Sequence, residues 1–147
     1  MKIRYHKLPD LVNPDGHSWY PFLQVCLRQT NRGRIFLALV DSGAADCIFP
    51  ASIGTLLGID VPSGRPQTYY GLAGQASPAF VHEVNLQVTG FNSWITIEAG
   101  FVIADVVPLL GQRGFFENYR VVFERFRLQF EVYTKMDALR PGSDRGY

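Results

Sequence analysis

The apolar run at residues 35–40 places the strongest constraint on how this chain can fold. Its six residues, Ile-Phe-Leu-Ala-Leu-Val, lead without a polar interruption into Asp41-Ser42-Gly43-Ala44. Such a run, rich in residues that favour strands, is typical of a strand buried in a β-sheet. A carboxylate at the end of a buried strand loses hydration unless it is hydrogen-bonded, paired or partly protonated. Asp41 is therefore the first candidate for a chemical role.

Alternating apolar residues predict further strands on both sides of this run. Residues 23–27 alternate in the period of a half-buried strand, and the turn at 31–33 joins them to the central run as a hairpin. Residues 67–70 and 80–88 predict a second hairpin, and its glycine-bearing tip suits a mobile lid. Later strands are expected at residues 95–103 and 126–132, the latter with Phe126, Leu128, Phe130 and Val132 facing inward.

Two helices are expected among these strands. Pro50 opens a brief helical stretch that ends at Gly58. Near the C-terminus, Phe115, Phe116, Tyr119, Val122 and Phe123 recur at helical spacing and predict an amphipathic helix of about three turns or fewer. Many closely spaced strands with only brief helices indicate a mainly antiparallel β domain that is closed or nearly so.

Length and composition favour one globular domain. The 147 residues, 47% of them hydrophobic, are enough to build a sizeable core. We expect an N-terminal arm at residues 1–18, the folded domain at 19–135 and a frayed C-terminal tail at 136–147. The turn residues Asn13-Pro14-Asp15-Gly16 separate the arm from the domain, and the arm itself is open to interpretation as a strand or an exposed tail.

Charge and cysteine content argue against several classes of partner. A net charge of +1 without a dense Lys/Arg block predicts no binding to nucleic acid or to an anionic membrane. The apolar stretch at residues 94–110 contains Glu98, Asp105 and Pro108, so it does not predict a membrane span. Cys26 and Cys47 fit buried thiols in a reducing compartment, which predicts a cytoplasmic location. The three histidines follow no ligand pattern, and neither a metal nor another cofactor is expected.

Two motifs together resemble the retroviral-type, or retropepsin-like, aspartic proteases. The first is Asp41-Ser42-Gly43-Ala44 after an apolar strand, and the second is Val107-Pro108-Leu109-Leu110-Gly111 near the C-terminal end of the domain. Their order and separation match the family, and the resemblance covers residues 20–133. It implies a closed antiparallel β-barrel-like acid protease fold with one short C-terminal helix.

The resemblance also implies an activity and a partner. Aspartic proteases use two carboxylates that share a proton across a two-fold axis. This chain carries one such motif, so the resemblance implies a homodimeric endopeptidase in which Asp41 of each subunit activates a water to hydrolyse a peptide or protein substrate. Ser42 would link the two active-site turns, and Gly43 would let the substrate backbone approach closely.

Further residues are assigned to substrate binding by the same resemblance. Leu39 and Leu109 would line or support apolar pockets, and Ala44 would keep the wall of the site narrow. The neighbouring Ala45 and Asp46 are also assigned to substrate contacts. The lid would close over the substrate backbone through the hairpin-tip residues Tyr70, Gly71, Leu72, Ala73 and Gly74.

One departure from the family pattern concerns an ion pair. Retroviral enzymes have an Asp where this chain has Ala45, and that Asp pairs with an Arg where this chain has Gln112. Both partners are absent together. Asp46 and Arg113, each one residue further along, are predicted to form a substitute pair.

Other interpretations remain open at this stage. Asp-Ser-Gly is a common turn in β proteins, and Leu-Leu-Gly often ends a helix or strand. A serine hydrolase is disfavoured because the sequence lacks a Gly-x-Ser-x-Gly elbow, and a metalloenzyme is disfavoured because it lacks His-Glu-x-x-His. The main alternative is a catalytically inactive retropepsin-like module that binds peptides or serves in assembly.

Overall fold

The computed structural model describes residues 1–10, 13 and 15–140 of the chain. Its strands are β1 (Lys2–Arg4), β2 (His6–Pro9), β3 (His17–Tyr20), β4 (Phe22–Gln29), β5 (Arg32–Val40), β6 (Cys47–Pro50), β7 (Arg65–Tyr70), β8 (Ala76–Val88), β9 (Ile95–Val102), β10 (Leu109–Leu110), β11 (Tyr119–Glu124) and β12 (Gln129–Thr134). Its helices are α1 (Ala51–Leu56), α2 (Lys135–Ala138) and the 3-10 turns η1 (Val61–Ser63) and η2 (Arg125–Arg127). No helix of these described residues combines the length and apolar character needed to cross a membrane.

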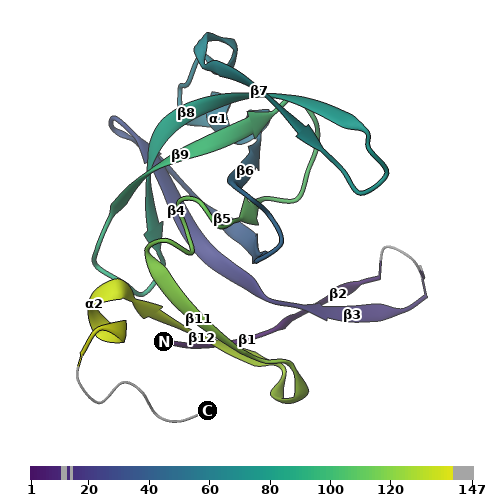
Figure 1. The fold of residues 1–147 in the computed structure, drawn as a ribbon, viewed down its shortest axis with the longest axis vertical. Coiled ribbons are helices and arrows are strands. Elements are labelled where there is room, and N and C mark those ends of the chain that lie inside the picture. The colour runs from purple at the N-terminus through teal and green to yellow at the C-terminus, as the bar shows by residue number, and fades with distance from the viewer. Residues whose placement is uncertain (11–12, 14, 141–147) are drawn as a thin grey trace.

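The main body of the molecule is a ring-like sheet (Figure 1). Seven strands pair in the order β4-β5-β10-β6-β9-β8-β7, and β4 also pairs with β8. That additional pairing brings the sheet round on itself, so the inward side chains of opposite strands share one core. Fully buried members of this core include Val25, Leu27, Phe49, Leu86 and Phe101. The mainly β fold predicted from the sequence is confirmed.

The alternating strands form where the sequence predicts them. Leu23, Val25 and Leu27 of β4 are buried, and so are Val84, Leu86 and Val88 of β8. The central strand β5 differs from the expectation of a fully buried run. Ile35 is 64% exposed and Leu37 is 38% exposed, because β5 presents one face to the core and the other to solvent.

The predicted short helix is also present. Helix α1 begins directly after Pro50, and Gly58 adopts φ +79° just beyond its end, a conformation that glycine permits at low cost. The hairpin of β7 and β8 follows, with its tip at residues 71–75. Gly74 at this tip likewise has φ +79°.

The helix expected over residues 115–123 is wrong. Residues 112–118 form turns apart from a β-bridge between Arg113 and Asp46, and strand β11 begins at Tyr119. Gly114 has φ +94°, which interrupts a helix, while the Phe115 and Tyr119 rings stack at 5.0 Å within the core. The apolar spacing therefore arises from turns packed against the core rather than from a helical face. The short helix near the C-terminus is α2 instead.

The last strand also starts later than expected. Phe126 is 81% exposed and lies in η2, and Leu128 adopts φ 53°, so the chain turns before it enters β12. Phe130 and Val132 are buried, as the sequence predicts. The C-terminal end of the predicted tail, residues 141–147, lies outside the described part of the chain.

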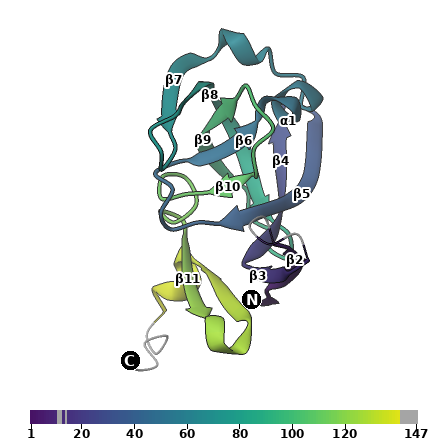
Figure 2. The same ribbon diagram turned by 90° about the vertical axis from the view of Figure 1, so that its right-hand side faces the viewer.

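The terminal segments form two smaller sheets below the ring. Strand β1 pairs antiparallel with β12, which pairs with β11, to give a three-stranded sheet that we call the terminal sheet. Strands β2 and β3 form a separate two-stranded hairpin that projects from the body (Figures 1 and 2). Of the predicted turn at residues 13–16, Pro14 lies outside the described residues, and the Gly16 amide donates to the Asn13 carbonyl at 2.8 Å.

Candidate active site

The turn that follows β5 is the centre of the candidate site. Strand β10 lies between β5 and β6, parallel to the first and antiparallel to the second. Leu109 of β10 is in register with Leu39 on one side and with Ile48 on the other. The fold thus brings the two sequence motifs side by side, although nearly 70 residues separate them in the chain.

Backbone hydrogen bonds from β10 and the residues after it hold this turn. The Asp41 amide donates to the Leu110 carbonyl at 3.1 Å. Beyond β10, the Gln112 and Arg113 amides donate to the carbonyls of Ala44 and Ala45, each at 2.9 Å. Both ends of the turn are therefore tied to the same segment, which fixes the position of the Asp41 backbone.

The Asp41 carboxylate is half-buried and oriented by its own turn. The Oδ1 atom of Asp41 accepts the Gly43 backbone N–H at 2.9 Å, and the backbone carbonyl of Asp41 accepts the Ala44 N–H at 3.2 Å. Ser42 and Gly43 are exposed on the surface of the turn. The carboxylate is thus held by one oxygen at a point where solvent and a ligand can reach the turn.

Gln112 and Gly111 belong to the site, although neither was among the predicted site residues. The Gln112 side chain donates from Nε2 to the Ser42 carbonyl at 2.6 Å. A Cβ at Gly111 would lie 2.1 Å from the Asp46 carbonyl oxygen, so only glycine fits there. Their position at the end of the Leu-Leu-Gly motif is the sequence signal that points to them.

Asp46 and Arg113 form the predicted substitute ion pair. Arg113 Nε lies 2.5 Å from Asp46 Oδ1, and Nη2 lies 2.9 Å from Oδ2, which is the bidentate arrangement of a guanidinium and a carboxylate. The hydrogen bond from Arg113 lowers the pKa of the Asp46 carboxyl. Burial and the nearby Asp46 raise the pKa of the Tyr69 hydroxyl.

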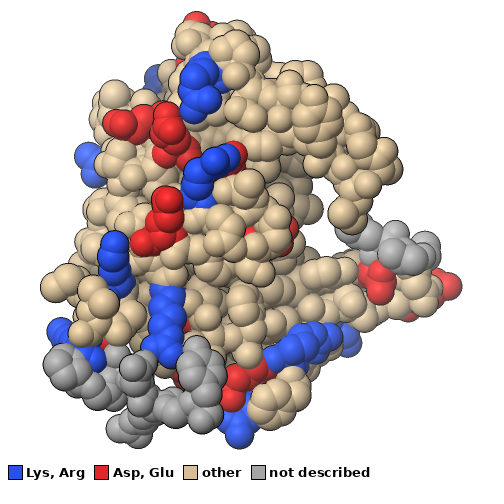
Figure 3. All heavy atoms as spheres, in the orientation of Figure 1, with Lys and Arg blue, Asp and Glu red and all other residues tan. Residues whose placement is uncertain are grey.

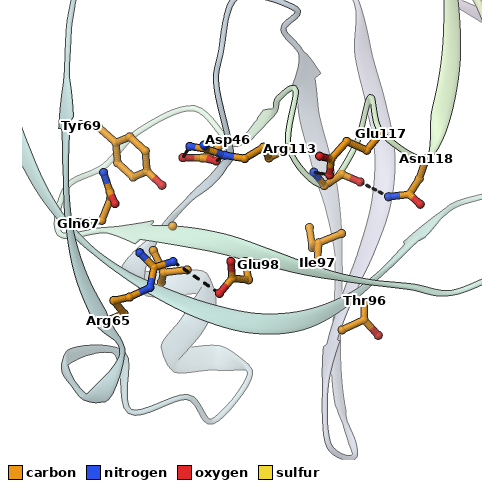
Figure 4. A pocket seen from close by; sticks show the side chains of 13 residues that line it. Asp46, Arg65, Gln67, Tyr69, Thr96, Ile97, Glu98, Arg113, Glu117 and Asn118 are labelled. Atoms are coloured by element: carbon orange, nitrogen blue, oxygen red, sulfur yellow. Dashed lines mark hydrogen bonds and ion pairs between the residues drawn. The ribbon is translucent and has the colours of Figure 1, made fainter.

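A polar pocket of about 460 Å³ lies next to this ion pair (Figure 4). Its lining comes from the turn after β5, from β7, β8 and β9, and from the segment after β10, and includes Asp46, Arg65, Gln67, Tyr69, Glu98, Arg113 and Glu117. Tyr69 fits there because Gly100 has no side chain: a Cβ at Gly100 would lie 2.4 Å from the Tyr69 hydroxyl. Asp41 does not line this pocket. The sequence did not predict it, since its walls come from distant segments.

The hairpin-tip residues assigned to substrate binding are separate from the turn and exposed. Tyr70, Gly71, Leu72, Ala73 and Gly74 form the tip of the β7–β8 hairpin, closed by the Gly71 amide donating to the Gln75 carbonyl at 3.0 Å. The tip lies on the same side of the molecule as the turn between β5 and β6 (Figures 1 and 2). The surface is hollowed between this tip and the β2–β3 hairpin (Figure 3).

The apolar residues assigned to the site lie at its base. Leu39 and Leu109 are half-buried neighbours on adjacent strands, and Ala44 is half-buried within the turn. The connector that leads into β10 also exposes Ile103 and Val107, two apolar residues that the sequence did not assign to the site. Exposed apolar side chains on a connector next to a candidate site are a signal that could have identified them.

The comparisons with known proteins find similarity in structure only. No protein-family model and no curated protein matches the sequence. A retropepsin-like aspartic protease from Rickettsia conorii is similar at a TM-score of 0.56 and 17% identity, covering 89% of this chain and 99% of that one. EIAV protease in complex with an inhibitor aligns at a TM-score of 0.42 and 19% identity, covering 63% of this chain and 82% of that one. The first similarity confirms the fold that the two motifs predict.

Proposed function

Because the chain has the retropepsin-like fold, we propose that it is an aspartic endopeptidase. The observation that carries this proposal is the placement of Asp41. Its carboxylate stands at the end of β5, accepts the Gly43 N–H at 2.9 Å, and sits on a turn held by the second motif. The bond to Gly43 is also one that an ordinary Asx-turn makes, but hydrolysis by an activated water requires a carboxylate held in this way, and the second motif holds this turn.

The proposed active form is a homodimer. Hydrolysis of this kind needs two carboxylates, and each chain supplies a single Asp41 in the appropriate motif. A two-fold axis beside the turn would place the Asp41 carboxylates of two copies next to each other in an isologous interface. Two carboxylates in contact resist double ionisation, so the pair would hold one shared proton.

The chemistry proceeds without a covalent intermediate. The ionised Asp41 takes a proton from water while the protonated Asp41 of the second copy donates its proton toward the scissile carbonyl oxygen. The water oxygen forms a bond to the carbonyl carbon, which becomes a tetrahedral diol. The carbon–nitrogen bond then breaks, the leaving nitrogen receives a proton from the pair, and one hydroxyl of the diol returns its proton to the pair as the carbonyl re-forms. The products are a carboxylic acid and an amine, and the carboxylates return to their singly protonated state.

The remaining site residues would position the substrate. Leu39 and Leu109 at the base of the site favour hydrophobic side chains at the cleaved bond, and Ala44 leaves room for the substrate backbone. Ala45 and Asp46 would contact the substrate further from the cleaved bond. The hairpin tip would add backbone hydrogen bonds to an extended peptide through Tyr70, Gly71, Leu72, Ala73 and Gly74. Ser42 would link the turns of the two copies.

The direct test is cleavage of a mixed peptide library at mildly acidic pH, with the Asp41→Asn variant as the matched control. Asparagine keeps the shape of the side chain but cannot act as a base. Cleavage beside hydrophobic residues that is lost in the variant and rises more steeply than linearly with protein concentration supports the dimeric protease. If wild type and variant are equally inert across pH and concentration, the chain is a peptide-binding or assembly module instead.

A further inference from the structure

The β2–β3 hairpin has no strand pairing with the rest of the described chain. Its register pairs His6 with Tyr20 and Pro9 with His17, and it forms a two-stranded sheet of its own. Within the described residues, no further strand pairs with either outer edge. Isolated two-stranded hairpins are marginally stable in water, and open edges invite pairing or packing with another chain.

The two faces of this hairpin differ in exposure. His6, Leu8, Ser18 and Tyr20 are half-buried, and the rings of His6 and Tyr20 contact Phe22 edge-on with centroids 6.3 and 6.2 Å away. The opposite face consists of exposed residues, Lys7, Pro9, His17 and Trp19. Trp19 is 37% exposed and stands opposite Lys7. Trp is among the residue types enriched where a partner binds, so Trp19 is the residue of this face best suited to such a contact.

The hairpin points to the side from which a second copy must approach. The turn between β5 and β6, the β7–β8 tip and the β2–β3 hairpin all lie on the right-hand side of Figure 1, and Figure 2 shows that side face on. If two Asp41 carboxylates are to meet, the second copy occupies this side. The hairpin then projects toward that copy.

Strand β1 is not available to pair with a second copy, because it already pairs with β12 in the terminal sheet of its own chain. The Met1 ammonium donates to the Val132 carbonyl at 2.7 Å, and the Val132 amide donates to the Met1 carbonyl at 2.8 Å. Lys2, Ile3 and Arg4 continue the pairing along β12. The β2–β3 hairpin is thus the N-terminal element that remains available for a partner.

Charge also favours a second copy as the partner. The hairpin carries Asp10 and Asp15 at its outer end and Lys7 opposite Trp19 nearer its base, so its outer end is acidic. The terminal sheet and its connecting turn are basic, with Lys2, Arg4, Arg120, Arg125 and Arg127 against Glu124 and Glu131. Figure 3 shows acidic atoms at the outer end of the hairpin, and basic atoms with a few acidic ones along the lower edge of the body. The acidic outer end of the hairpin in one copy suits the basic sheet of another.

From these observations we propose that the β2–β3 hairpin is a dimerisation arm that packs on the terminal sheet of a second copy. The proposal rests on the homodimer of the proposed function, and it names the surface that holds that dimer together. Two arms related by the two-fold axis make the same contact twice. Trp19 is the central apolar residue of each contact, and the acidic end of the arm sets its orientation.

The first experiment removes the arm. Replacing residues 7–19 by Asn-Gly joins His6 to Tyr20 through a two-residue turn and retains the buried Tyr5 and Phe22. Sedimentation equilibrium should show a dimer dissociation constant at least tenfold higher than that of the wild type, with unchanged circular dichroism. An unchanged dissociation constant overturns the proposal that the hairpin is a dimerisation arm, and it leaves the proposed protease function intact. A wild type that is monomeric at every concentration overturns both.

The second experiment leaves the arm in place and needs no deletion. The chain has two Trp residues of similar exposure, Trp19 at 37% and Trp94 at 38% in the turn between β8 and β9. In Trp94→Phe, acrylamide quenching reports on Trp19 alone, and in Trp19→Phe it reports on Trp94 alone. The Trp19 quenching constant should fall at least twofold as the dimer forms, while that of Trp94 stays constant. Equal quenching of Trp19 in monomer and dimer overturns the proposal.

Discussion

Arg113 binds both oxygens of Asp46, with Nε 2.5 Å from Oδ1 and Nη2 2.9 Å from Oδ2. The contact joins the far end of the turn that carries Asp41 to the segment that follows β10. Backbone hydrogen bonds from Gln112 and Arg113 run beside it. The turn that carries Asp41 is thus held by these backbone hydrogen bonds together with a planar, two-point contact that a lysine cannot reproduce.

We expect this ion pair to make the protein less stable in acid. The pKa of Asp46 is lowered in the folded state, so its contribution to stability is present above about pH 4, the ordinary range of an Asp, and is lost as pH falls through the lowered value. Asp46→Asn should therefore lower the melting temperature at pH 7 and have little effect near pH 2. If the melting temperatures of the wild type and the variant differ by the same amount at pH 7 and near pH 2, the ion pair is not the cause of the lost stability. Arg113→Lys, which keeps the charge, should recover only part of the stability.

Gly111→Ala should prevent the chain from folding normally. The added Cβ would lie 2.1 Å from the Asp46 carbonyl oxygen and 2.8 Å from that of Ala44, and both are backbone atoms that cannot move aside. We expect the free energy of unfolding to fall by more than about 2 kcal/mol in urea denaturation. Gly33→Ala is the control, since a Cβ there lies 3.6 Å from its nearest neighbours and should change stability by less than about 1 kcal/mol. Equal effects of the two changes would rule out the steric explanation.

The sequence predicts the strands well where only one face is buried. Leu23, Val25 and Leu27 alternate with polar residues, and that period fits no other element. The segment after β10 is harder to predict. Phe115 and Tyr119 are spaced as in a helix, yet turns bring their rings into contact. The positive φ of Gly114 and the contacts of these rings with the core decide the outcome, and neither can be read from spacing.

In the candidate site, too, local sequence patterns are predictable, whereas contacts between distant segments are not. Asp41, Ser42 and Gly43 are contiguous, so a motif identifies them, and Asp46 and Arg113 could be paired because both family positions change together. The polar pocket is different. Arg65, Tyr69 and Glu98 come from β7 and β9, and only the pairing of both strands with β8 brings them to one place. The projection of the β2–β3 hairpin likewise depends on how the chain packs.

Phe115→Ala should be among the most destabilising changes in the chain. The Phe115 side chain is fully buried and contacts Phe116 and Tyr119, with ring centroids 5.3 and 5.0 Å away. Removing a buried ring leaves a cavity and typically costs about 3–5 kcal/mol. Phe126→Ala is the matched control, because its ring is exposed and should cost less than about 1 kcal/mol. Chemical denaturation of both variants measures the difference, and similar values would contradict the packing described for Phe115.

Gln112→Leu should loosen the Asp41 turn without unfolding the protein. The change removes the 2.6 Å hydrogen bond to the Ser42 carbonyl, and because Gln112 is exposed we expect a loss of only about 1 kcal/mol in the free energy of unfolding. The Gly43 amide, which is bonded to Asp41, should then exchange its hydrogen faster, and peptide cleavage should slow by about tenfold. Hydrogen exchange followed by NMR tests the first effect independently of activity. Gln24→Leu, at an exposed position on β4, should change neither rate. If Gly43 exchanges at the wild-type rate in the Gln112 variant, the side chain does not support the turn.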